Sequence, residues 1–206
     1  MSERSFERTP GAIQGYTSAV NSKIGSERPH HMTNIKDVAG YILRDASDSG
    51  QRVRHMKLQK LCYYAQGYHL AITGSPLFPE EFEAWQYGPV APELEQEFGV
   101  FGHAPIPPPT NSPALTEFEQ MLLDLVIARF EWYNDFDLSR LTHREDPWRN
   151  ARGRKAEVGA SIITKGAIHE WFAPRLHTLS IKEPPPPPTP AELDDLLAFA
   201  KYLLEQ

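Results

Sequence analysis

His55, Cys62 and His69 are the residues whose types and spacing first suggest metal or nucleophile chemistry in this sequence. They recur every seven residues, so one face of a helix would carry all three. Seven residues of helix rise about 10 Å, so neighbours in this series lie too far apart to bind one metal ion. Cys62 also stands among apolar helix positions, which favours a packed core thiol over a nucleophile. The series therefore predicts ordinary core or surface residues.

Sequence motifs of enzymes are equally scarce. The chain contains no GxxxxGK[ST] phosphate loop, no Rossmann glycine pattern, no GxSxG turn and no HExxH zinc motif. The segment HEWFAPRLH begins like a zinc motif at His169, but its second histidine is His177, eight residues later and beyond a proline. We therefore expect no catalytic residues, no metal ligands and no cofactor.

Two clusters of basic residues suggest a different chemistry, the binding of phosphate groups. The first cluster spans residues 52–60 and the second spans residues 149–155. Either cluster fits a nucleic-acid-binding regulator, whose binding would weaken steeply with salt. The chain as a whole has a net charge of -6, which gives no general attraction for a polyanion. Solvated or partner-facing clusters are the simpler interpretation, and nucleic-acid binding stays as the alternative function.

The composition is that of a folded protein from a reducing compartment. Its 206 residues suit one domain with extensions, and 40% hydrophobic residues supply a sizeable core. No apolar run approaches the ~20 residues that cross a bilayer, and the first residues lack the apolar stretch of a secretory signal. A single cysteine cannot form an internal disulfide. We expect a cytoplasmic protein without a membrane partner.

The prolines and the periodic apolar residues divide the chain into four segments. Residues 1–31 show no sustained period and are predicted to be a flexible extension or a non-native leader. Residues 32–180 carry the helical patterns and form the predicted domain. A proline-rich spacer over 181–190 precedes an amphipathic helix over 191–206.

The periodicity within the domain predicts a mainly α, compact, multi-helix fold. A helix that Thr116 opens with a capping box to Glu119 has the most apolar pattern, so we expect it at the centre of the core. The last segment of the domain, SIITKGAIHEWFAPRL, is expected to form one helix that Pro174 bends or breaks. The remaining helices are expected from Thr33 to about Ser47, over 56–74, over 92–98, in LSRLTHRED and in PWRNAR.

One short segment has the period of a strand instead of a helix. Side chains of FEAWQY at 82–87 alternate in character, and Gly88 with Pro89 is expected to close this strand. We expect a small β-hairpin-like element near residues 77–88. Its other strand is predicted near Leu77 or further along the chain.

Three segments in a fixed order resemble a known family. They are KLQKLCYYAQGYHLA, FEAWQYGPVAPEL and LTHREDPWRNAR. Together with the helix IITKGAIHEWF they span about residues 33–175, and the combination is similar to the SocA-like, Panacea-type antitoxin domain. The positions that match the family pattern and are candidates for structural or partner-binding roles are Lys57, Gln59, Lys60, Tyr64, Trp85, Gly88, Pro89, Val90, Thr142, His143, Pro147 and Trp148.

This resemblance implies a bacterial antitoxin that neutralises a protein toxin encoded beside it. One member of the family is a proteolytic adaptor that delivers its toxin to the ClpXP protease, so occlusion and delivery both stay open. The family is not known for enzymatic activity, and most of its motif residues are implied to be structural. The segments 1–31 and 190–206 extend beyond the resemblance and are candidate contacts for the toxin or the protease.

Overall fold

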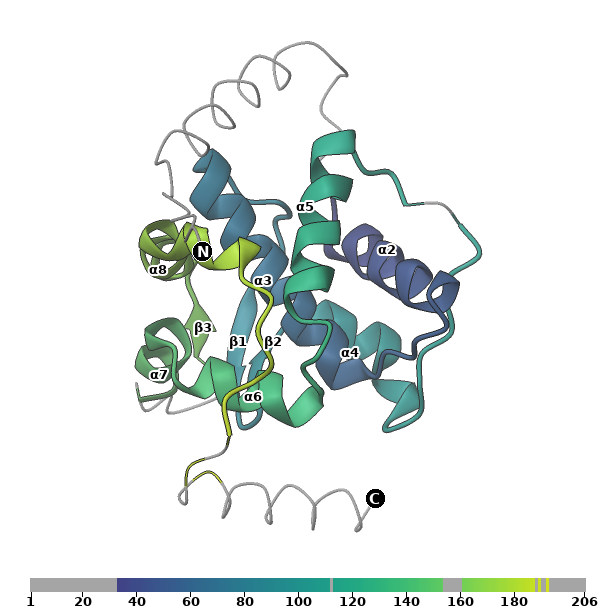
Figure 1. The fold of residues 1–206 in the computed structure, drawn as a ribbon. Coiled ribbons are helices and arrows are strands. Elements are labelled where there is room, and N and C mark those ends of the chain that lie inside the picture. The colour runs from purple at the N-terminus through teal and green to yellow at the C-terminus, as the bar shows by residue number, and fades with distance from the viewer. Residues whose placement is uncertain (1–32, 112, 154–160, 188, 190–191, 193–206) are drawn as a thin grey trace, which may run out of the picture. The chain divides into compact units, whose positions relative to one another are not determined.

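A computed structural model describes residues 33–111, 113–153, 161–187, 189 and 192. This part of the chain forms a mainly helical domain with a small antiparallel sheet (Figure 1), so the predicted fold class is confirmed. The predicted extension over 1–31 lies outside the described residues. The predicted helix over 191–206 also lies outside them, apart from residue 192.

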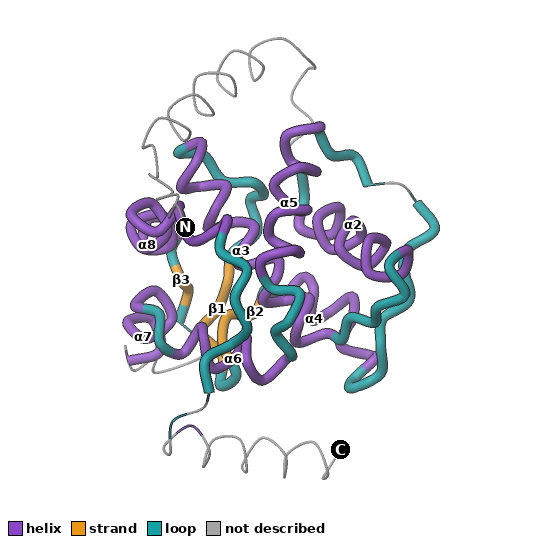
Figure 2. The backbone as a smooth tube through the Cα atoms, viewed as in Figure 1, coloured by secondary structure: helices purple, strands orange, loops and turns teal. Residues whose placement is uncertain are grey.

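Most of the described elements are helices, and the three strands are short (Figure 2). Their order is α2 (Ile35–Asp48), α3 (His55–Thr73), β1 (Phe82–Trp85), β2 (Gly88–Val90), α4 (Pro92–Phe98), the 3-10 helix η1 (Gly99–Phe101), α5 (Glu117–Arg129), α6 (Asp135–His143), α7 (Asp146–Gly153), β3 (Ile162–Ile163), α8 (Lys165–Phe172) and the 3-10 helix η2 (Ala173–Ser180).

Helix α3 is the central element of the domain. It packs against α2, α5, α6, α8, η2 and β2 (Figure 1). Every residue from Leu58 to Leu70 is buried, so this helix buries polar residues on its sides as well as an apolar stripe. Gly74, the last residue of the range 56–74 predicted for this helix, ends it with a left-handed conformation, φ 71°.

The prediction that the helix after Thr116 lies at the centre of the core is wrong. The predicted capping box between Thr116 and Glu119 is present, and Leu122 is fully packed. However, Leu125 is 41% exposed and Met121 is 38% exposed. Apolar residues occupy a wider part of the circumference of α5 than the part that faces the core. The helix therefore packs on one side of α3 and leaves some of its apolar side chains exposed.

The predicted hairpin exists, but its first strand ends at Trp85, earlier than the predicted strand over 82–87. Strand β1 pairs antiparallel with β2, and the register places Trp85 opposite Gly88. Gly88 and Pro89 therefore start the second strand, and Gln86 with Tyr87 forms the turn. The partner strand lies further along the chain and not near Leu77. Strand β3 pairs with the other edge of β1 and completes the order β2-β1-β3.

Two helix starts also differ from the predicted ones. Asn34 caps α2 by accepting a hydrogen bond from the backbone N–H of Asp37, whereas the Thr33 hydroxyl donates to Glu119 at 2.7 Å. The last predicted helix begins at Lys165, because Ile162 and Ile163 extend the sheet instead. In both cases, residues that local periodicity assigned to a helix instead contact residues distant in the sequence.

Candidate functional site

Two buried polar side chains of α3 hold the backbone of β2 and the residue that follows it. The Gln59 side-chain oxygen accepts from the Ala91 N–H at 2.9 Å, and its amide nitrogen donates to the Ala91 carbonyl at 3.2 Å. Lys60 Nζ donates to the Pro89 carbonyl at 2.9 Å. Strand β2 is an edge of the described sheet, so these side chains satisfy backbone groups that another strand would otherwise satisfy.

Helices α6 and α7 hold the tip and the other strand of the hairpin. Ser139 Oγ donates to the Tyr87 carbonyl at 3.1 Å. The Trp148 indole N–H donates to the Trp85 carbonyl at 3.0 Å, and Arg152 donates to the Ala84 carbonyl at 3.2 Å. Five side chains from three helices therefore fix the hairpin through its backbone.

Gly88 sits where the hairpin comes closest to these helices. Its φ of 105° lies in the region that favours glycine. A Cβ atom at this position would lie 2.6 Å from Lys60 Cε and 2.6 Å from Thr142 Oγ1. Thr142 is itself fixed, because its hydroxyl donates to the Ser139 carbonyl at 2.8 Å. The predicted motif residues Lys60, Gly88 and Thr142 thus meet at one crowded point.

The outward side of the hairpin presents aromatic surface. Trp85 is 37% exposed, and its indole N–H donates to Glu83 at 2.7 Å. Trp148 is half-buried and stacks on His143, with ring centroids 4.1 Å apart. Trp85, the exposed Gln86 and Trp148 are called the hairpin rim below. Amphipathic rings on a fixed backbone are typical anchors in protein interfaces.

Lys60, one of the hairpin supports, and Glu145 are buried ionisable side chains. Burial lowers the pKa of Lys60 to about 7, although Asp135 and Glu95 favour its charged form. Burial raises the pKa of Glu145 to about 7, against the hydrogen bond of 2.8 Å that Tyr64 donates to its carboxyl. Each group is therefore readily neutralised near neutral pH, which reduces the cost of leaving it in the core.

The other motif positions have structural surroundings. Lys57 Nζ donates to the Tyr133 carbonyl at 2.7 Å, and Val90 and Pro147 are buried. Ser139 and Glu145 belong to the same arrangement but were not singled out from the sequence, and Arg152 was considered only as part of the basic cluster 149–155. The signal for such a role was weak, because polar and charged residues are ordinarily expected to be exposed.

The first predicted basic cluster, residues 52–60, does not form a continuous cationic surface. Lys60 is buried, and the Lys57 ammonium donates to a backbone carbonyl. Arg54 faces the Asp135 carboxylate at 3.7 Å. These three cationic side chains therefore make their contacts within the protein.

The second predicted basic cluster, residues 149–155, is described only in part. Arg149 faces Asp146 at 3.4 Å, and Arg152 supports the hairpin. Residues 154–155 lie outside the described residues.

The side chains of the histidine and cysteine series are buried or hydrogen-bonded within the domain. Cys62 is fully buried, and burial raises the pKa of its thiol, which makes the thiolate scarce. His69 Nδ1 lies 2.8 Å from the Ser75 carbonyl, and His55 Nε2 lies 3.0 Å from the Gln59 amide. Among the described residues, no three potential ligands are grouped closely enough to hold a metal ion.

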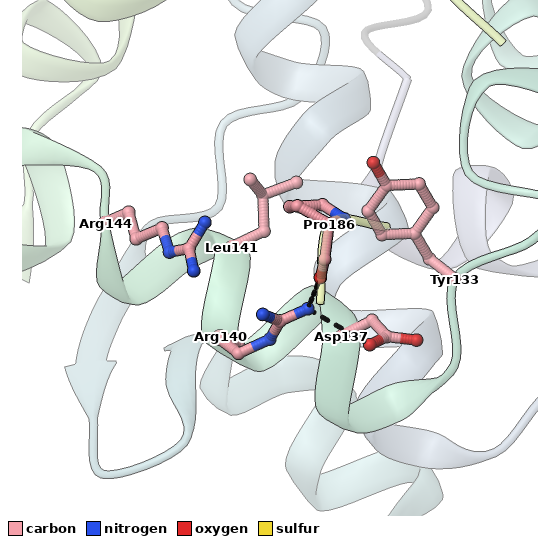
Figure 3. A pocket seen from close by; sticks show the side chains of 6 residues that line it. All are labelled: Tyr133, Asp137, Arg140, Leu141, Arg144 and Pro186. Atoms are coloured by element: carbon pink, nitrogen blue, oxygen red, sulfur yellow. Dashed lines mark hydrogen bonds and ion pairs between the residues drawn. The ribbon is translucent and has the colours of Figure 1, made fainter. Parts of the chain in front are cut away.

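A second local feature is the segment 181–187, called the C-terminal strap, which runs past α6 (Figure 1). The buried Arg140 donates to the Pro186 carbonyl and faces Asp137 at 3.5 Å (Figure 3). The cavity beside them measures only about 10 Å³, close to the space of one water molecule. This feature is therefore a clamp on the strap and not a ligand pocket.

Glu192 fastens the chain just beyond the strap. Arg144 donates to its two carboxylate oxygens at 2.7 and 2.6 Å, and these hydrogen bonds are the main reason that the pKa of Glu192 falls to about 2. We expect Glu192→Gln to speed trypsin cleavage after Lys182 about fivefold, since a partly exposed pair of this kind contributes on the order of 1 kcal/mol. Timed limited proteolysis at pH 7 measures this rate.

The matched control for the strap is Glu170→Gln, which changes an exposed carboxylate on α8. Its cleavage rate after Lys182 should equal that of the unmodified protein. In the unmodified protein the contribution of Glu192 is fully present above the ordinary pKa of 4.5 and is lost as pH falls through about 2. Equal rates for both variants would show that the pair does not hold the strap.

Fold and site define a class of small helical domain in which side chains from three helices hold a β-hairpin by its backbone. A family model described as "Antitoxin SocA-like, Panacea domain" matches residues 58–149. The antitoxin SocA of Caulobacter vibrioides (strain NA1000 / CB15N) is 38% identical over 173 residues, which cover 74% of this chain and 88% of that protein. The chain therefore belongs to the family of SocA-like antitoxins with the Panacea domain, as the sequence motifs indicated.

No solved structure matches the chain. Within the described residues, no helix has both the length and the apolar character needed to cross a bilayer.

Proposed function

We propose that this protein is a cytoplasmic antitoxin that binds and neutralises a protein toxin encoded beside it. We further propose that the hairpin rim belongs to the toxin-binding surface. The observation that carries this proposal is the set of six hydrogen bonds by which five side chains fix the backbone of the hairpin and of the residue after it. A surface held in place before binding loses less conformational freedom when the partner docks. The protein then acts by occupying a surface of the toxin and not by catalysis.

A finer proposal is that the protein delivers its toxin to the ClpXP protease. Its support is the resemblance to an antitoxin family in which one member works as a proteolytic adaptor. Delivery requires a surface for the protease in addition to one for the toxin, whereas simple occlusion requires one surface. The half-life of the toxin, measured with and without ClpXP, separates the two: a toxin stabilised by loss of ClpXP supports delivery, and an unchanged half-life supports occlusion.

Trp85→Ala is expected to weaken toxin binding by about tenfold to a hundredfold, because exposed tryptophan anchors carry much of the energy of an interface. The ring is 37% exposed and its backbone carbonyl stays bonded to Trp148, so the melting temperature should change little. Isothermal titration of the toxin measures the affinity. The control is Val100→Ala, an apolar side chain that is 86% exposed elsewhere. An unchanged affinity of Trp85→Ala for the toxin would show that the hairpin rim is not part of the interface.

A further inference from the structure

The outward face of α5 is a second surface with exposed apolar side chains. Met121 and Leu125 are one helical turn apart and are 38% and 41% exposed. Trp132, in the turn that follows the helix, is 64% exposed. This face is the one that the sequence assigned to the core and that the fold leaves outside. The surface made by Met121, Leu125 and Trp132 is called the α5 face below.

Acidic side chains border the α5 face. Glu117, Asp124 and Glu131 are exposed, and the exposed residues between 116 and 134 include no basic residue. Arg129 is partly buried, with its guanidinium 5.2 Å from the centre of the Phe130 ring. The border is therefore negatively charged along the length of the helix.

Helix α2 extends the acidic border on one side. Tyr41 donates its hydroxyl to Asp124 at 2.7 Å. Burial raises the pKa of Asp45, and the nearby carboxylates Asp124 and Asp48 raise it further. Like charges are thus crowded next to the apolar residues, and a cationic partner would relieve their repulsion.

The charge of this border decides which occupant fits. A second copy of the chain would bring the same carboxylates against one another across a symmetric interface. Residues 1–31 of the chain carry four basic residues against three acidic ones, which is too balanced to neutralise the border. A helix with apolar residues on one side and lysine or arginine at its edges matches both the apolar centre and the acidic border.

We propose that the α5 face binds a basic amphipathic helix of a partner protein. Met121 and Leu125 receive its apolar side chains, and Glu117, Asp124 and Glu131 pair with its cations. Methionine and leucine side chains adapt readily to such apolar partners. This inference goes beyond the proposed function, because it concerns residues other than the hairpin rim and a partner segment that the toxin proposal does not require.

The test uses the full chain and three fluorescent peptides of about 16 residues, the length of helix that spans the α5 face. The first is an amphipathic lysine–leucine helix, the second has the same composition with the leucines spread around the helix, and the third has glutamate in place of lysine. Fluorescence anisotropy at fixed ionic strength measures each affinity. We expect the first peptide to bind at least about tenfold more tightly than the other two.

Variants locate the binding on the chain. Leu125→Ser, Met121→Ser and Glu117→Lys should each weaken the first peptide about tenfold or more, while circular dichroism melting confirms that each variant is folded. Val100→Ser and Glu170→Lys are the matched apolar and acidic controls at other exposed positions. Both controls should bind the peptide like the unmodified protein.

Three outcomes would overturn the inference. They are equal binding of all three peptides, equal losses in the controls, and a dimer in light scattering that Leu125→Ser dissociates, which would assign the face to a second copy. The readout does not involve the toxin. Peptide binding without toxin neutralisation would therefore contradict only the proposed function, and toxin neutralisation without peptide binding would contradict only the α5 face.

Discussion

Gly88→Ala is expected to lower the free energy of unfolding by about 3 kcal/mol or more, one of the largest effects of a single substitution in this protein. The backbone of Gly88 has a φ of 105°, which costs a residue with a Cβ atom energy before any contact is considered. The added methyl group would also lie 2.6 Å from both Lys60 Cε and Thr142 Oγ1. Urea unfolding followed by circular dichroism measures the loss.

The matched control is Gly166→Ala on α8. A Cβ atom there meets no atom within 4 Å, and the backbone is helical. This substitution should leave the protein as stable as before or up to about 1 kcal/mol more stable, because alanine favours helix over glycine. If Gly88→Ala and Gly166→Ala unfold at the same urea concentration, the hairpin is not packed as described.

The free energy of unfolding is also expected to pass through a minimum near pH 7. Burial raises the pKa of Glu145 from 4.5 to about 7, so the folded protein holds this proton more tightly than the unfolded chain. Its contribution to stability is fully present below pH 4.5 and is lost as pH rises to about 7. The loss is on the order of 3 kcal/mol, since each pKa unit corresponds to about 1.4 kcal/mol.

Lys60 causes the free energy of unfolding to rise again above pH 7. Burial lowers its pKa from 10.5 to about 7, so the folded protein holds this proton less tightly than the unfolded chain. Stability therefore increases as pH rises from about 7 and is fully regained above 10.5. The gain is on the order of 5 kcal/mol by the same conversion. Because the folded-state pKa values of both groups are about 7, their two contributions together place the minimum of stability near that pH.

Urea unfolding at pH 5, 7 and 9 tests this profile. Glu145→Gln should flatten the acid side, and Lys60→Met should flatten the alkaline side while keeping a side chain of similar length. The difference between each variant and the unmodified protein separates these groups from His55 and His69, whose pKa values burial lowers. A stability maximum near pH 7 in the unmodified protein, or unchanged slopes in both variants, would contradict the description of these buried groups.

Features that depend on neighbouring residues were predictable from the sequence. The capping box of Thr116 with Glu119, the end of α3 at Gly74 and the short helix from Pro92 to Phe98 all occur where the sequence placed them. Each depends on chemistry within one or two turns of chain. Local patterns are therefore sufficient for the existence and type of most elements.

Features that depend on distant contacts were not predictable in the same way. Helix α3 is buried on all sides, whereas the more apolar α5 leaves Leu125 outside. The packing of the other elements around α3 decides this, and periodicity carries no information about which apolar helix is central. Ile162 and Ile163 likewise join the sheet because β1 offers an edge far away in sequence.

Some residues of the candidate site were likewise predictable from the sequence, and others were not. Motif resemblance selected Gln59, Lys60 and Trp148, and the structure shows their side chains bonded to the hairpin backbone. It did not select Ser139 or Arg152, which have the same role from α6 and α7. A hydrogen bond from a side chain to a distant carbonyl leaves no pattern in a single sequence, so these partners emerge only with the fold.

The most direct test of the proposed function is co-expression of this protein with the product of the gene beside its own, followed by growth and by co-purification. We predict that the neighbouring product alone arrests growth, that co-expression restores it, and that the two proteins purify together from cells lacking ClpXP. Trp85→Ala should restore growth less well and retain less partner. Continued growth arrest in the presence of this protein, with no complex recovered from cells lacking ClpXP, would contradict the proposed antitoxin function.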